Sequence, residues 1–251
     1  MSSRWFEPAT PRVLAHRGLA LDAPENTLLA FERAVDAGAA YLETDVHLSA
    51  DGEAVVAHDP TLERVAPGRR ERVADLPVAE LRRVDLGGGQ GFATLDEVLH
   101  AFPGVRFNID VKTDAAVHAT VEAVRRAAAA DRVLLTAFSD ARRRRLGAMV
   151  PGAVTSAGRT SVLRARAASL ARNPSLLRRA VAGAQALQVP ERVGRMALLT
   201  PALVASAHAA GVEVHVWTVN EEADMRRLLA LGIDGIVTDR ADLALRVVSQ
   251  S

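Results

Sequence analysis

The chain contains no cysteine, so a disulfide framework and thiolate chemistry are both excluded. No apolar run approaches the roughly 20 residues that a membrane-spanning helix needs. Residues 1–11 also lack the apolar core of a signal peptide. These absences predict a protein without stable membrane insertion, located in the cytoplasm.

An excess of charge of one sign is also missing, since the formal net charge is +1. The basic run Arg142 to Arg145 has no second basic cluster and no interleaved aromatic residues beside it. It therefore predicts an exposed helix face rather than a nucleic-acid surface, and we expect no nucleic-acid partner. Oligomeric state cannot be read from these features.

Lysine is almost absent. Of 31 basic residues, only Lys112 is a lysine, and the abundance of arginine and alanine is typical of a genome rich in GC codons. Chance survival is one explanation for this single lysine. The other is a site that needs a compact ammonium group, which a planar guanidinium cannot replace.

Short β-branched runs alternate with longer helical patterns, which predicts a parallel sheet. The expected strands are residues 13–17, 41–48, 106–112, 133–138, 154–157, 186–189, 212–219 and 235–238, with a hairpin arm at 54–58. The expected helices are 27–37, 95–101, 114–130, 140–148, 160–182, 200–210, 221–231 and 240–248. Asn26 or Thr27 is expected to cap the first helix.

The number of strands and the length of 251 residues favour an α/β fold, a (β/α)8 TIM barrel forming one domain over residues 1–251. The alternative is an open doubly wound sheet, but no glycine-rich dinucleotide loop follows the first strand. Residues 60–91 are poorer in strand signals. We predict that they form a small insertion after the second strand, with a short helix near 77–84, at the mouth of the barrel.

Acidic side chains lie on the inward faces of two expected strands. Glu43 and Asp45 alternate along the second strand and Asp110 lies on the third, so the three should converge. A buried carboxylate is costly unless it is paired or binds a metal. Oxygen ligands alone suit Mg²⁺ or Ca²⁺, so one divalent cation is predicted. A purely structural network of carboxylates and arginines is the alternative.

Two histidines, His16 and His58, each end an expected strand, and two imidazoles at one mouth can act as acid and base near neutral pH. His47 shares a face with the acids, and its role as ligand, supporting group or loop residue stays open. His215, in mid-strand, is predicted to be a hydrogen-bonded core residue. The remaining histidines fall on helices, where we expect solvent-facing or packing positions: His100, His118 and His208.

Several motifs occur in a fixed order between residues 13 and 239. They are His16-Arg17-Gly18, Pro24-Glu25-Asn26-Thr27, Glu43-Thr44-Asp45-Val46-His47-Leu48, His58-Asp59, Asn108-Ile109-Asp110-Val111-Lys112, Trp217-Thr218-Val219-Asn220 and Gly235-Ile236-Val237-Thr238-Asp239. Each motif alone is weak, but the ordered set is specific. With it, the chain resembles the glycerophosphodiester phosphodiesterase family of the cytoplasmic, bacterial type.

The resemblance implies a TIM barrel with an insertion after the second strand. It implies that Glu43, Asp45 and Asp110 bind one divalent metal, and that His16 and His58 form the acid–base pair. The family commonly has glutamate at the third of these acidic positions. Aspartate is one methylene shorter, so the metal must shift toward this strand or take a bridging water.

The resemblance further implies that Arg17 and Lys112 contact the substrate phosphate, which gives the single lysine a function. From its place at a strand end, Trp217 is expected to form an apolar wall for the glycerol, with packing in the barrel core as the alternative. Phe138 is expected near the same pocket. Glu25 is expected to support the site.

The implied reaction is metal-dependent hydrolysis of small glycerophosphodiesters to glycerol 3-phosphate and an alcohol. Attack by the glycerol hydroxyl through a cyclic phosphate and direct attack by water both stay open. The alternatives are a phospholipase D-like phosphodiesterase on the same fold and a non-catalytic barrel that binds a phosphodiester.

Overall fold

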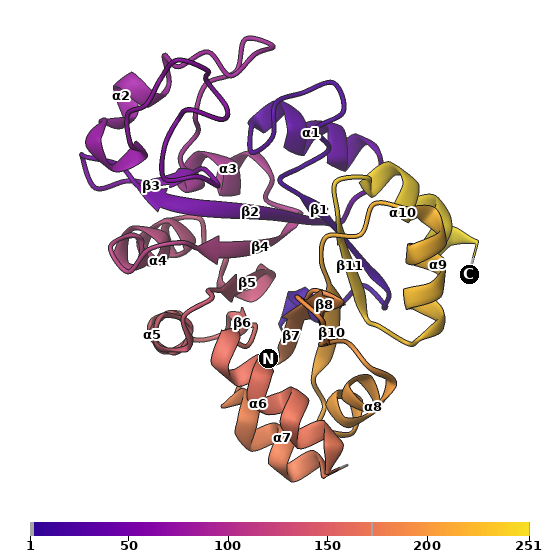
Figure 1. The fold of residues 1–251 in the computed structure, drawn as a ribbon. Coiled ribbons are helices and arrows are strands. Elements are labelled where there is room, and N and C mark those ends of the chain that lie inside the picture. The colour runs from indigo at the N-terminus through magenta and orange to yellow at the C-terminus, as the bar shows by residue number, and fades with distance from the viewer. Residues whose placement is uncertain (1–2, 172, 251) are drawn as a thin grey trace.

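Eight parallel strands form a barrel in the computed structural model, which describes residues 3–171 and 173–250 (Figure 1). The positions 1, 2, 172 and 251 of the predicted domain lie outside the described residues. The barrel strands are β1 (Arg12–His16), β2 (Tyr41–Leu48), β4 (Arg106–Val111), β5 (Val133–Thr136), β6 (Val154–Thr155), β7 (Ala186–Val189), β10 (Glu213–Val216) and β11 (Gly235–Thr238).

The ring of strands closes at two places. The first strand β1 pairs in parallel with the last strand β11, and β6 meets β7 through a bridge between Ser156 and Ala186. The Ala157 amide also donates to the Ala186 carbonyl at 2.9 Å. The predicted TIM barrel is therefore confirmed, and the open doubly wound sheet is wrong.

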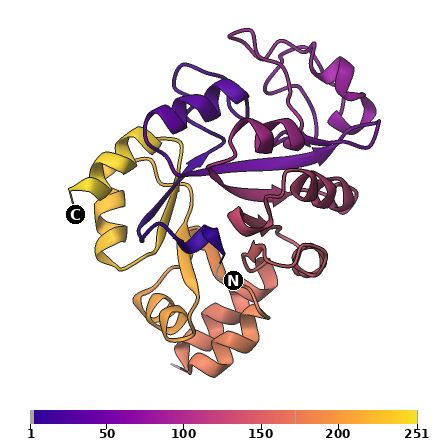
Figure 2. The same cartoon turned by 180° about the vertical axis from the view of Figure 1, so that it is seen from behind.

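Helices cover the outside of the barrel (Figures 1 and 2). They are α1 (Leu28–Asp36), α3 (Leu95–Ala101), α4 (Ala116–Arg126), α5 (Asp140–Met149), α6 (Arg159–Leu170), α7 (Pro174–Val181), α8 (Pro201–Ala209), α9 (Glu222–Ala230) and α10 (Ala241–Ser249), with short 3-10 turns at Arg4–Phe6 and Ala130–Arg132. Thr27 caps α1, because its side chain accepts a hydrogen bond from the Ala30 amide at 3.2 Å. Within 3–171 and 173–250, no helix is both long and apolar enough to cross a membrane.

The predicted single helix over 160–182 is wrong, because α6 and α7 are separate helices there. Asn173 caps α7 with its side-chain oxygen, and Pro174 occupies the first helical position. Proline at this position starts a helix and cannot continue one, so the two residues mark a boundary that the apolar pattern hid.

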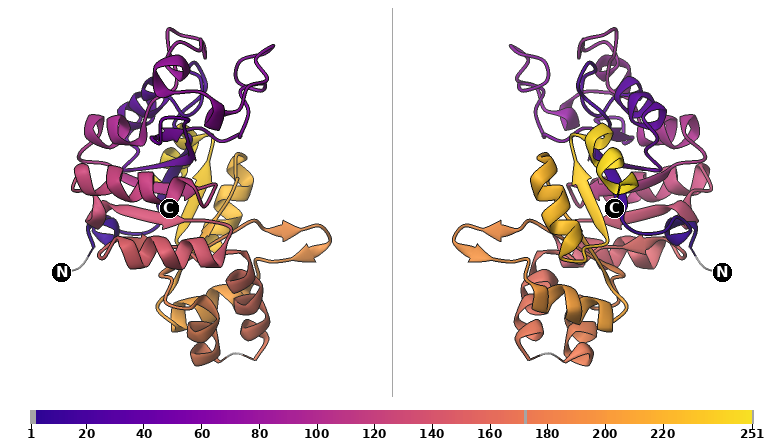
Figure 3. Two further views of the ribbon diagram at one scale, coloured as in Figure 1. Left: turned by 90° about the vertical axis from the view of Figure 1, so that its left-hand side faces the viewer. Right: turned by 90° about the vertical axis from the view of Figure 1, so that its right-hand side faces the viewer.

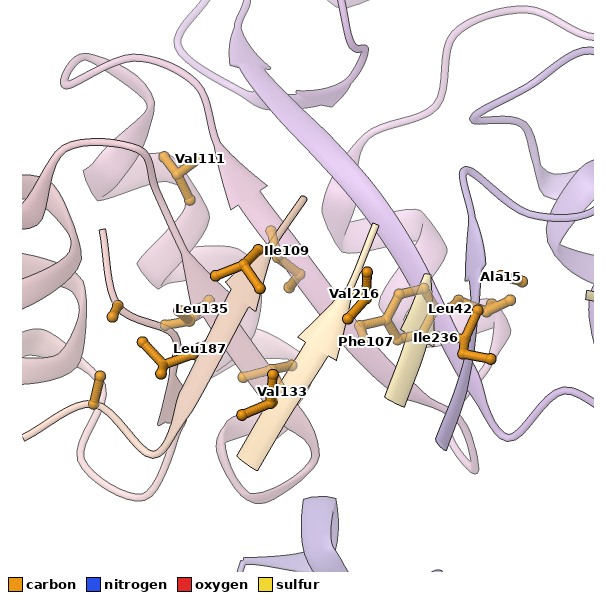
Figure 4. Packing of buried hydrophobic residues seen from close by; sticks show 14 of the residues in the cluster. Ala15, Leu42, Phe107, Ile109, Val111, Val133, Leu135, Leu187, Val216 and Ile236 are labelled. Carbon is orange, nitrogen blue, oxygen red and sulfur yellow. The ribbon is translucent and has the colours of Figure 1, made fainter. Parts of the chain in front are cut away.

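Side chains alternate along each strand between the two faces of the barrel wall. The outward-facing residues pack beneath the helices; Figure 4 shows among them Ala15, Leu42, Phe107, Ile109 and Val216. In the lower half of the barrel, toward the N-terminal ends of the strands, the inward-facing residues form a second apolar cluster: Leu14, Tyr41, Leu134, Val154, Ala186 and Val237, with Trp5 against them. This cluster fills the lower barrel, so the polar inward residues must lie above it, toward the C-terminal ends of the strands.

The segment between β2 and α3 extends beyond the barrel wall. It contains β3 (Ala54–Val56), which runs antiparallel to β2, a 3-10 turn at Val73–Asp75 and the short helix α2 (Val78–Leu81). It has a small apolar cluster of its own, comprising Val55, Ala57, Leu62, Ala66, Val73, Val78, Leu81, Val84 and Phe92. This cluster explains how a segment poor in strand signals keeps a defined structure beside the mouth.

A second excursion, not predicted from the sequence, follows β7. It is a hairpin of β8 (Arg192–Val193) and β9 (Met196–Ala197), which protrudes from the body of the molecule (Figure 3). Each arm has two residues, too few for an alternating pattern to be recognised.

The prediction that Arg142 to Arg145 form an exposed helix face is wrong for two of these residues. Arg143 is buried, and its guanidinium donates to the carbonyls of Val181 and Ala182 at 3.3 and 3.1 Å. Arg142 donates to the Lys112 carbonyl at 2.8 Å. Both arginines hydrogen-bond carbonyl groups of neighbouring elements that no local sequence pattern identifies.

A buried ion pair stabilises the N-terminal end of the barrel. Arg12, 3% exposed, donates to both carboxylate oxygens of Glu213 at 2.7 and 2.9 Å. Burial alone would raise the pKa of Glu213, but the hydrogen bonds from Arg12 and His215 outweigh it and lower the pKa to about 2. His215 is fully buried beside Glu213 at 3.0 Å, which confirms it as a hydrogen-bonded core residue.

We expect Arg12→Met to lower the free energy of unfolding by about 3–5 kcal/mol, because it leaves a buried carboxylate without its main partner. The pKa of Glu213 in the folded protein, about 2, lies below the ordinary glutamate value of 4.5. This carboxylate therefore contributes its full stabilisation above pH 4.5 and loses it as the pH falls toward 2. Urea unfolding at pH 7 and pH 3.5 measures this. The difference in free energy of unfolding between wild type and Arg12→Met should be smaller at pH 3.5.

The matched control for this variant is Arg226→Met, which breaks an exposed pair with Glu222. Surface pairs contribute about 0–1 kcal/mol, so the control should remain close to wild type. If Arg12→Met and Arg226→Met lowered the free energy of unfolding equally, the buried pair would not be the stabilising feature inferred here.

Candidate active site

A cavity of about 640 Å³ opens at the C-terminal ends of the barrel strands. It is lined by every site residue predicted from the sequence: His16, Arg17, Glu43, Asp45, His58, Asp110, Lys112 and Trp217. The structure thus brings these side chains together, while the roles assigned to them stay predictions.

Strand register explains the convergence. Across neighbouring parallel strands, His16 pairs with Glu43, and Asp45 pairs with Asp110. Paired residues on adjacent strands point to the same face, so the four side chains enter the barrel from two adjoining levels. They lie directly above the apolar cluster of the lower barrel.

Lys112 lies between two carboxylates. Its Nζ is 2.6 Å from Asp45 Oδ1 and 2.7 Å from Asp110 Oδ2. Burial opposes charge on the ammonium, but the two carboxylates outweigh it and raise the pKa of Lys112. Burial likewise opposes charge on Asp45, yet Lys112 and Arg17 lower the pKa of this carboxyl. For Asp110, burial prevails and raises the pKa.

Glu43 has less compensating charge. One of its carboxylate oxygens accepts a hydrogen bond from the Arg17 amide at 3.1 Å and lies 3.9 Å from His16 Nε2. Burial, followed by the negative charge of Asp45, raises the pKa of Glu43 to about 8. The site therefore holds more buried acidic groups than its own cations neutralise.

The turn after β1 aims Arg17 at the cavity. Arg17 has φ 58° and Gly18 has φ 87°. A Cβ atom at position 18 would lie 2.6 Å from the Ala30 carbonyl carbon, so only glycine fits against α1 there. The Arg17 guanidinium lies 3.0 Å from Glu25 Oε1 and 3.2 Å from Asp45 Oδ2, with no hydrogen-bond geometry at the second contact.

His16 is held by two residues that the sequence analysis did not assign to the site. Its Nδ1 lies 2.6 Å from Asp239 Oδ1, and Asn220 donates to the other oxygen of Asp239 at 2.7 Å. Burial lowers the pKa of His16, but the hydrogen bond to Asp239 and the charge of Glu43 outweigh it and raise the pKa overall. The available signal was the position of Asp239 after β11, which becomes β1's neighbour once the barrel closes.

His58 follows β3 and has a similar arrangement. Its Nδ1 lies 2.8 Å from Asp59 Oδ1. The Nε2 atom of His47 lies 3.0 Å from the His58 carbonyl, so His47 supports the backbone of the neighbouring histidine. Burial lowers the pKa of His47. In both His16 and His58, a carboxylate contacts Nδ1, which leaves Nε2 for another partner.

The oxygen donors of the cavity suit a hard cation. Asp110 Oδ1 and Asn108 Oδ1 are buried and have no hydrogen-bond partner within residues 3–171 and 173–250, and Glu43 lacks full charge compensation. Among the residues that the structure describes, no three His, Asp or Glu side chains already stand in the arrangement of a metal site. The Lys112 ammonium lies between two of the three carboxylates. The fit to Mg²⁺ or Ca²⁺ therefore lies in the kind of donor atom, since the available ligands are carboxylate and amide oxygens.

Comparison with known proteins identifies the family. Residues 16–243 match the Glycerophosphoryl diester phosphodiesterase family. The chain belongs to this family. The predicted resemblance is thus confirmed, together with the prediction that the chain is an enzyme, a phosphoric diester hydrolase.

Individual relatives agree with this assignment. The chain is 40% identical to the probable glycerophosphodiester phosphodiesterase 2 of Mycobacterium tuberculosis, over 92% of this chain and 88% of that one. It is 30% identical to a glycerophosphodiester phosphodiesterase of Caldanaerobacter subterraneus, over 94% and 97%. A putative glycerophosphoryl diester phosphodiesterase from Silicibacter pomeroyi superposes with a TM-score of 0.80 at 28% identity, over 97% and 94%.

In this family member, a chain of ion pairs links the two sides of the site through Arg64, which lies between β3 and α2. Arg64 pairs with Asp59, the partner of His58, and donates to both carboxylate oxygens of Glu25 at 2.6 and 2.9 Å. Glu25 in turn contacts Arg17. Arg64 therefore holds both carboxylates that orient His58 and Arg17.

We expect Arg64→Met to lower kcat/KM about 10-fold, the lower end of the range for groups that orient a site from outside it. kcat should fall because Asp59, which contacts His58, is no longer held by Arg64. KM should rise because Glu25, which contacts Arg17, loses the same partner. Steady-state kinetics of the diester hydrolysis would separate the two. The control is Arg70→Met, whose side chain is 85% exposed and lies 3.4 Å from Glu63. Matching kinetics in both variants would refute the positioning role of Arg64.

Proposed function

We propose that this enzyme hydrolyses small glycerophosphodiesters to glycerol 3-phosphate and an alcohol, with His16 and His58 as the acid–base pair and with dependence on a divalent cation. The observation that carries the proposal is the composition of the cavity. It combines two imidazoles, each with Nδ1 against a carboxylate, with two cationic side chains and three buried acids. The cytoplasmic location and the lack of a nucleic-acid partner stay predictions from the sequence.

Arg17 and Lys112 would bind the non-bridging oxygens of the phosphate, where negative charge is concentrated in the transition state. The guanidinium offers a two-pronged contact and the ammonium a point charge. Asp45 and Asp110 hold Lys112 in place. Trp217 would form the apolar wall beside the glycerol carbons.

One histidine would remove the proton from the nucleophile, and the other would protonate the leaving alcohol. In each imidazole, a carboxylate at Nδ1 fixes the ring and favours the form with Nε2 directed at the substrate. Attack by water and attack by the neighbouring glycerol hydroxyl are both compatible with this pair. The order in which the two histidines act is also open.

Glu43, Asp45 and Asp110 would hold the divalent cation. When bound, a cation here would supply positive charge to the phosphate. Because Asp110 is shorter than the glutamate common in the family, we expect the cation preference to be the property most affected.

The test is release of glycerol 3-phosphate from glycerophosphocholine and glycerophosphoethanolamine, measured with Mg²⁺, Ca²⁺, Mn²⁺ or EDTA. Release with a cation and its loss in EDTA would support the proposal, and the most effective cation would identify the site's preference. Release that persists in EDTA would remove the cation from the proposal. No release with any cation, from folded protein that binds the diester, would overturn the proposed reaction for these substrates.

A further inference from the structure

The near-zero net charge conceals an uneven distribution of charge along the chain. Residues 141–190 contain ten arginines and no aspartate or glutamate, whereas the average of 30 acids in 251 residues would place about six in a stretch of this length. Because the whole chain has a formal net charge of +1, this segment carries +10 and the remainder carries −9. The segment covers α5, β6, α6, α7 and β7, which are neighbours around the barrel, so one side of the molecule is basic (Figure 1).

Most arginines on this basic side lack an acidic partner. Arg142 pairs with Asp114, and Arg143 is buried against carbonyl groups. Within 3–171 and 173–250, no carboxylate pairs with six other arginines of the segment, all exposed: Arg144, Arg145, Arg159, Arg164, Arg178 and Arg179. The basic run Arg142 to Arg145 is thus one part of a larger basic side, whose charge is available to an external partner.

Exposed hydrophobic side chains gather where the basic side meets the mouth of the cavity. Four of them have exposed fractions of 44–59% and line the same cavity: Phe138, Leu163, Val193 and Met196. Val193 and Met196 are paired across the β8–β9 hairpin, so they share one of its faces. Arg159 lines the cavity beside them, and Arg192 and Arg195 are exposed on the hairpin. These four hydrophobic and three basic residues are called the basic lip.

The composition of the basic lip favours a lipid surface as its partner. Exposed hydrophobic side chains that gather in one place mark an interaction site. A bilayer accepts such side chains at the boundary between headgroups and acyl chains, while arginines bind anionic lipid phosphates. Nucleic acid fits less well, since three of the four hydrophobic residues are not aromatic and cannot stack on bases. The hairpin protrudes as a narrow arm (Figure 3), which a fluid surface can accommodate without a complementary shape.

We propose that the basic lip docks the enzyme on anionic lipid bilayers. Val193 and Met196 enter the headgroup region, and Arg159, Arg192 and Arg195 bind lipid phosphates. The remainder of the chain, with its charge of −9, is repelled by the same surface. Docking therefore has one orientation, with the mouth of the cavity toward the bilayer. This binding is peripheral, and it neither requires the proposed hydrolysis nor follows from it.

The test is sedimentation of the full chain with phosphatidylcholine vesicles that either contain or lack phosphatidylglycerol. We expect binding to the anionic vesicles alone, and weaker binding as salt screens the charges. The double variant Arg192→Glu with Arg195→Glu should weaken binding about 30-fold, because each basic residue near an anionic surface contributes a factor of about five. Val193→Ser with Met196→Ser should weaken it about 10-fold, since loss of two buried methylene groups alone has an effect of this size.

The matched control is Arg72→Glu with Arg83→Glu. It changes the net charge by the same amount at two exposed arginines outside the basic side, and neither forms an ion pair within the described part of the chain. Binding of the control should stay within a few-fold of wild type. Equal weakening in the control and in Arg192→Glu with Arg195→Glu would assign the binding to overall charge and overturn the role of the basic lip.

The remaining outcomes also decide the proposal. No binding to anionic vesicles overturns it. Binding that is unchanged in Val193→Ser with Met196→Ser, together with equal affinity for duplex DNA, identifies a general polyanion surface and overturns the lipid assignment. Self-association that this serine variant abolishes, without vesicle binding, makes the basic lip an interface between copies of the chain and likewise overturns it. Vesicle binding is measured without a diester substrate, so its failure leaves the proposed reaction standing.

Discussion

Replacement of His16 by alanine should lower kcat about 10²–10⁴-fold, the range for loss of a general acid or base. The imidazole lies at the end of β1, with Nδ1 fixed by Asp239 and Nε2 facing Glu43 across 3.9 Å. Alanine removes the proposed proton-transfer group and leaves Arg17 and Lys112, the proposed phosphate-binding residues, in place. KM should therefore change far less than kcat, as measured by initial rates of diester hydrolysis.

His100→Ala is the matched control, since that histidine is exposed on α3 and does not line the cavity. It should retain wild-type kinetics. A His16→Ala enzyme with kcat within a few-fold of wild type would exclude His16 from the acid–base pair. If His58→Ala lost activity while His16→Ala kept it, a mechanism with one histidine would replace the proposed pair.

The part of the site that could be predicted from the sequence depends on strand periodicity. Glu43 and Asp45 alternate on β2, and Asp110 and Lys112 alternate on β4 and just beyond it, so each pair had to share a face. Parallel pairing in chain order then brings the two faces together. Both steps follow from the order of the elements along the chain and do not depend on closure of the barrel.

The partners of these residues were not predictable in the same way. Asp239 reaches His16 only because closure of the barrel places β11 beside β1, which no local pattern records. Arg64 reaches Glu25 through the irregular path of the segment between β3 and α2. Arg143 is buried because its guanidinium bonds carbonyls at the end of α7, although its own helix predicts an exposed face.

The anchoring contacts also explain why the site's polar groups tolerate burial. Each cation faces at least two acids, and each imidazole is held by one acid. Burial and the neighbouring negative charge of Asp45 raise the pKa of Glu43 to about 8, so an added cation would stabilise the charged form of this carboxylate. The same cavity thus combines groups that neutralise one another with Glu43, whose neighbours are the Arg17 amide at 3.1 Å and His16 Nε2 at 3.9 Å.

Replacement of Lys112 by arginine should lower kcat/KM about 10²-fold, comparable to loss of one group that stabilises transition-state charge. The ammonium occupies a space 2.6 Å from Asp45 and 2.7 Å from Asp110, with 17% of the side chain exposed. A planar guanidinium is larger and cannot take this position without moving a carboxylate. Steady-state hydrolysis of a glycerophosphodiester measures the effect.

Lys112→Met separates shape from charge. The arginine variant keeps the positive charge, so its free energy of unfolding should fall less than that of the methionine variant. The methionine variant leaves Asp45 and Asp110 buried without their shared cation, and unfolding should become easier by about 3–5 kcal/mol. Arg125→Lys, at an exposed pair with Glu122, is the control for exchanging the two cations, and its kinetics should not change. A Lys112→Arg enzyme with wild-type kcat/KM would mean that the site needs only a positive charge, and the single lysine in an arginine-rich chain would then be explained by chance survival.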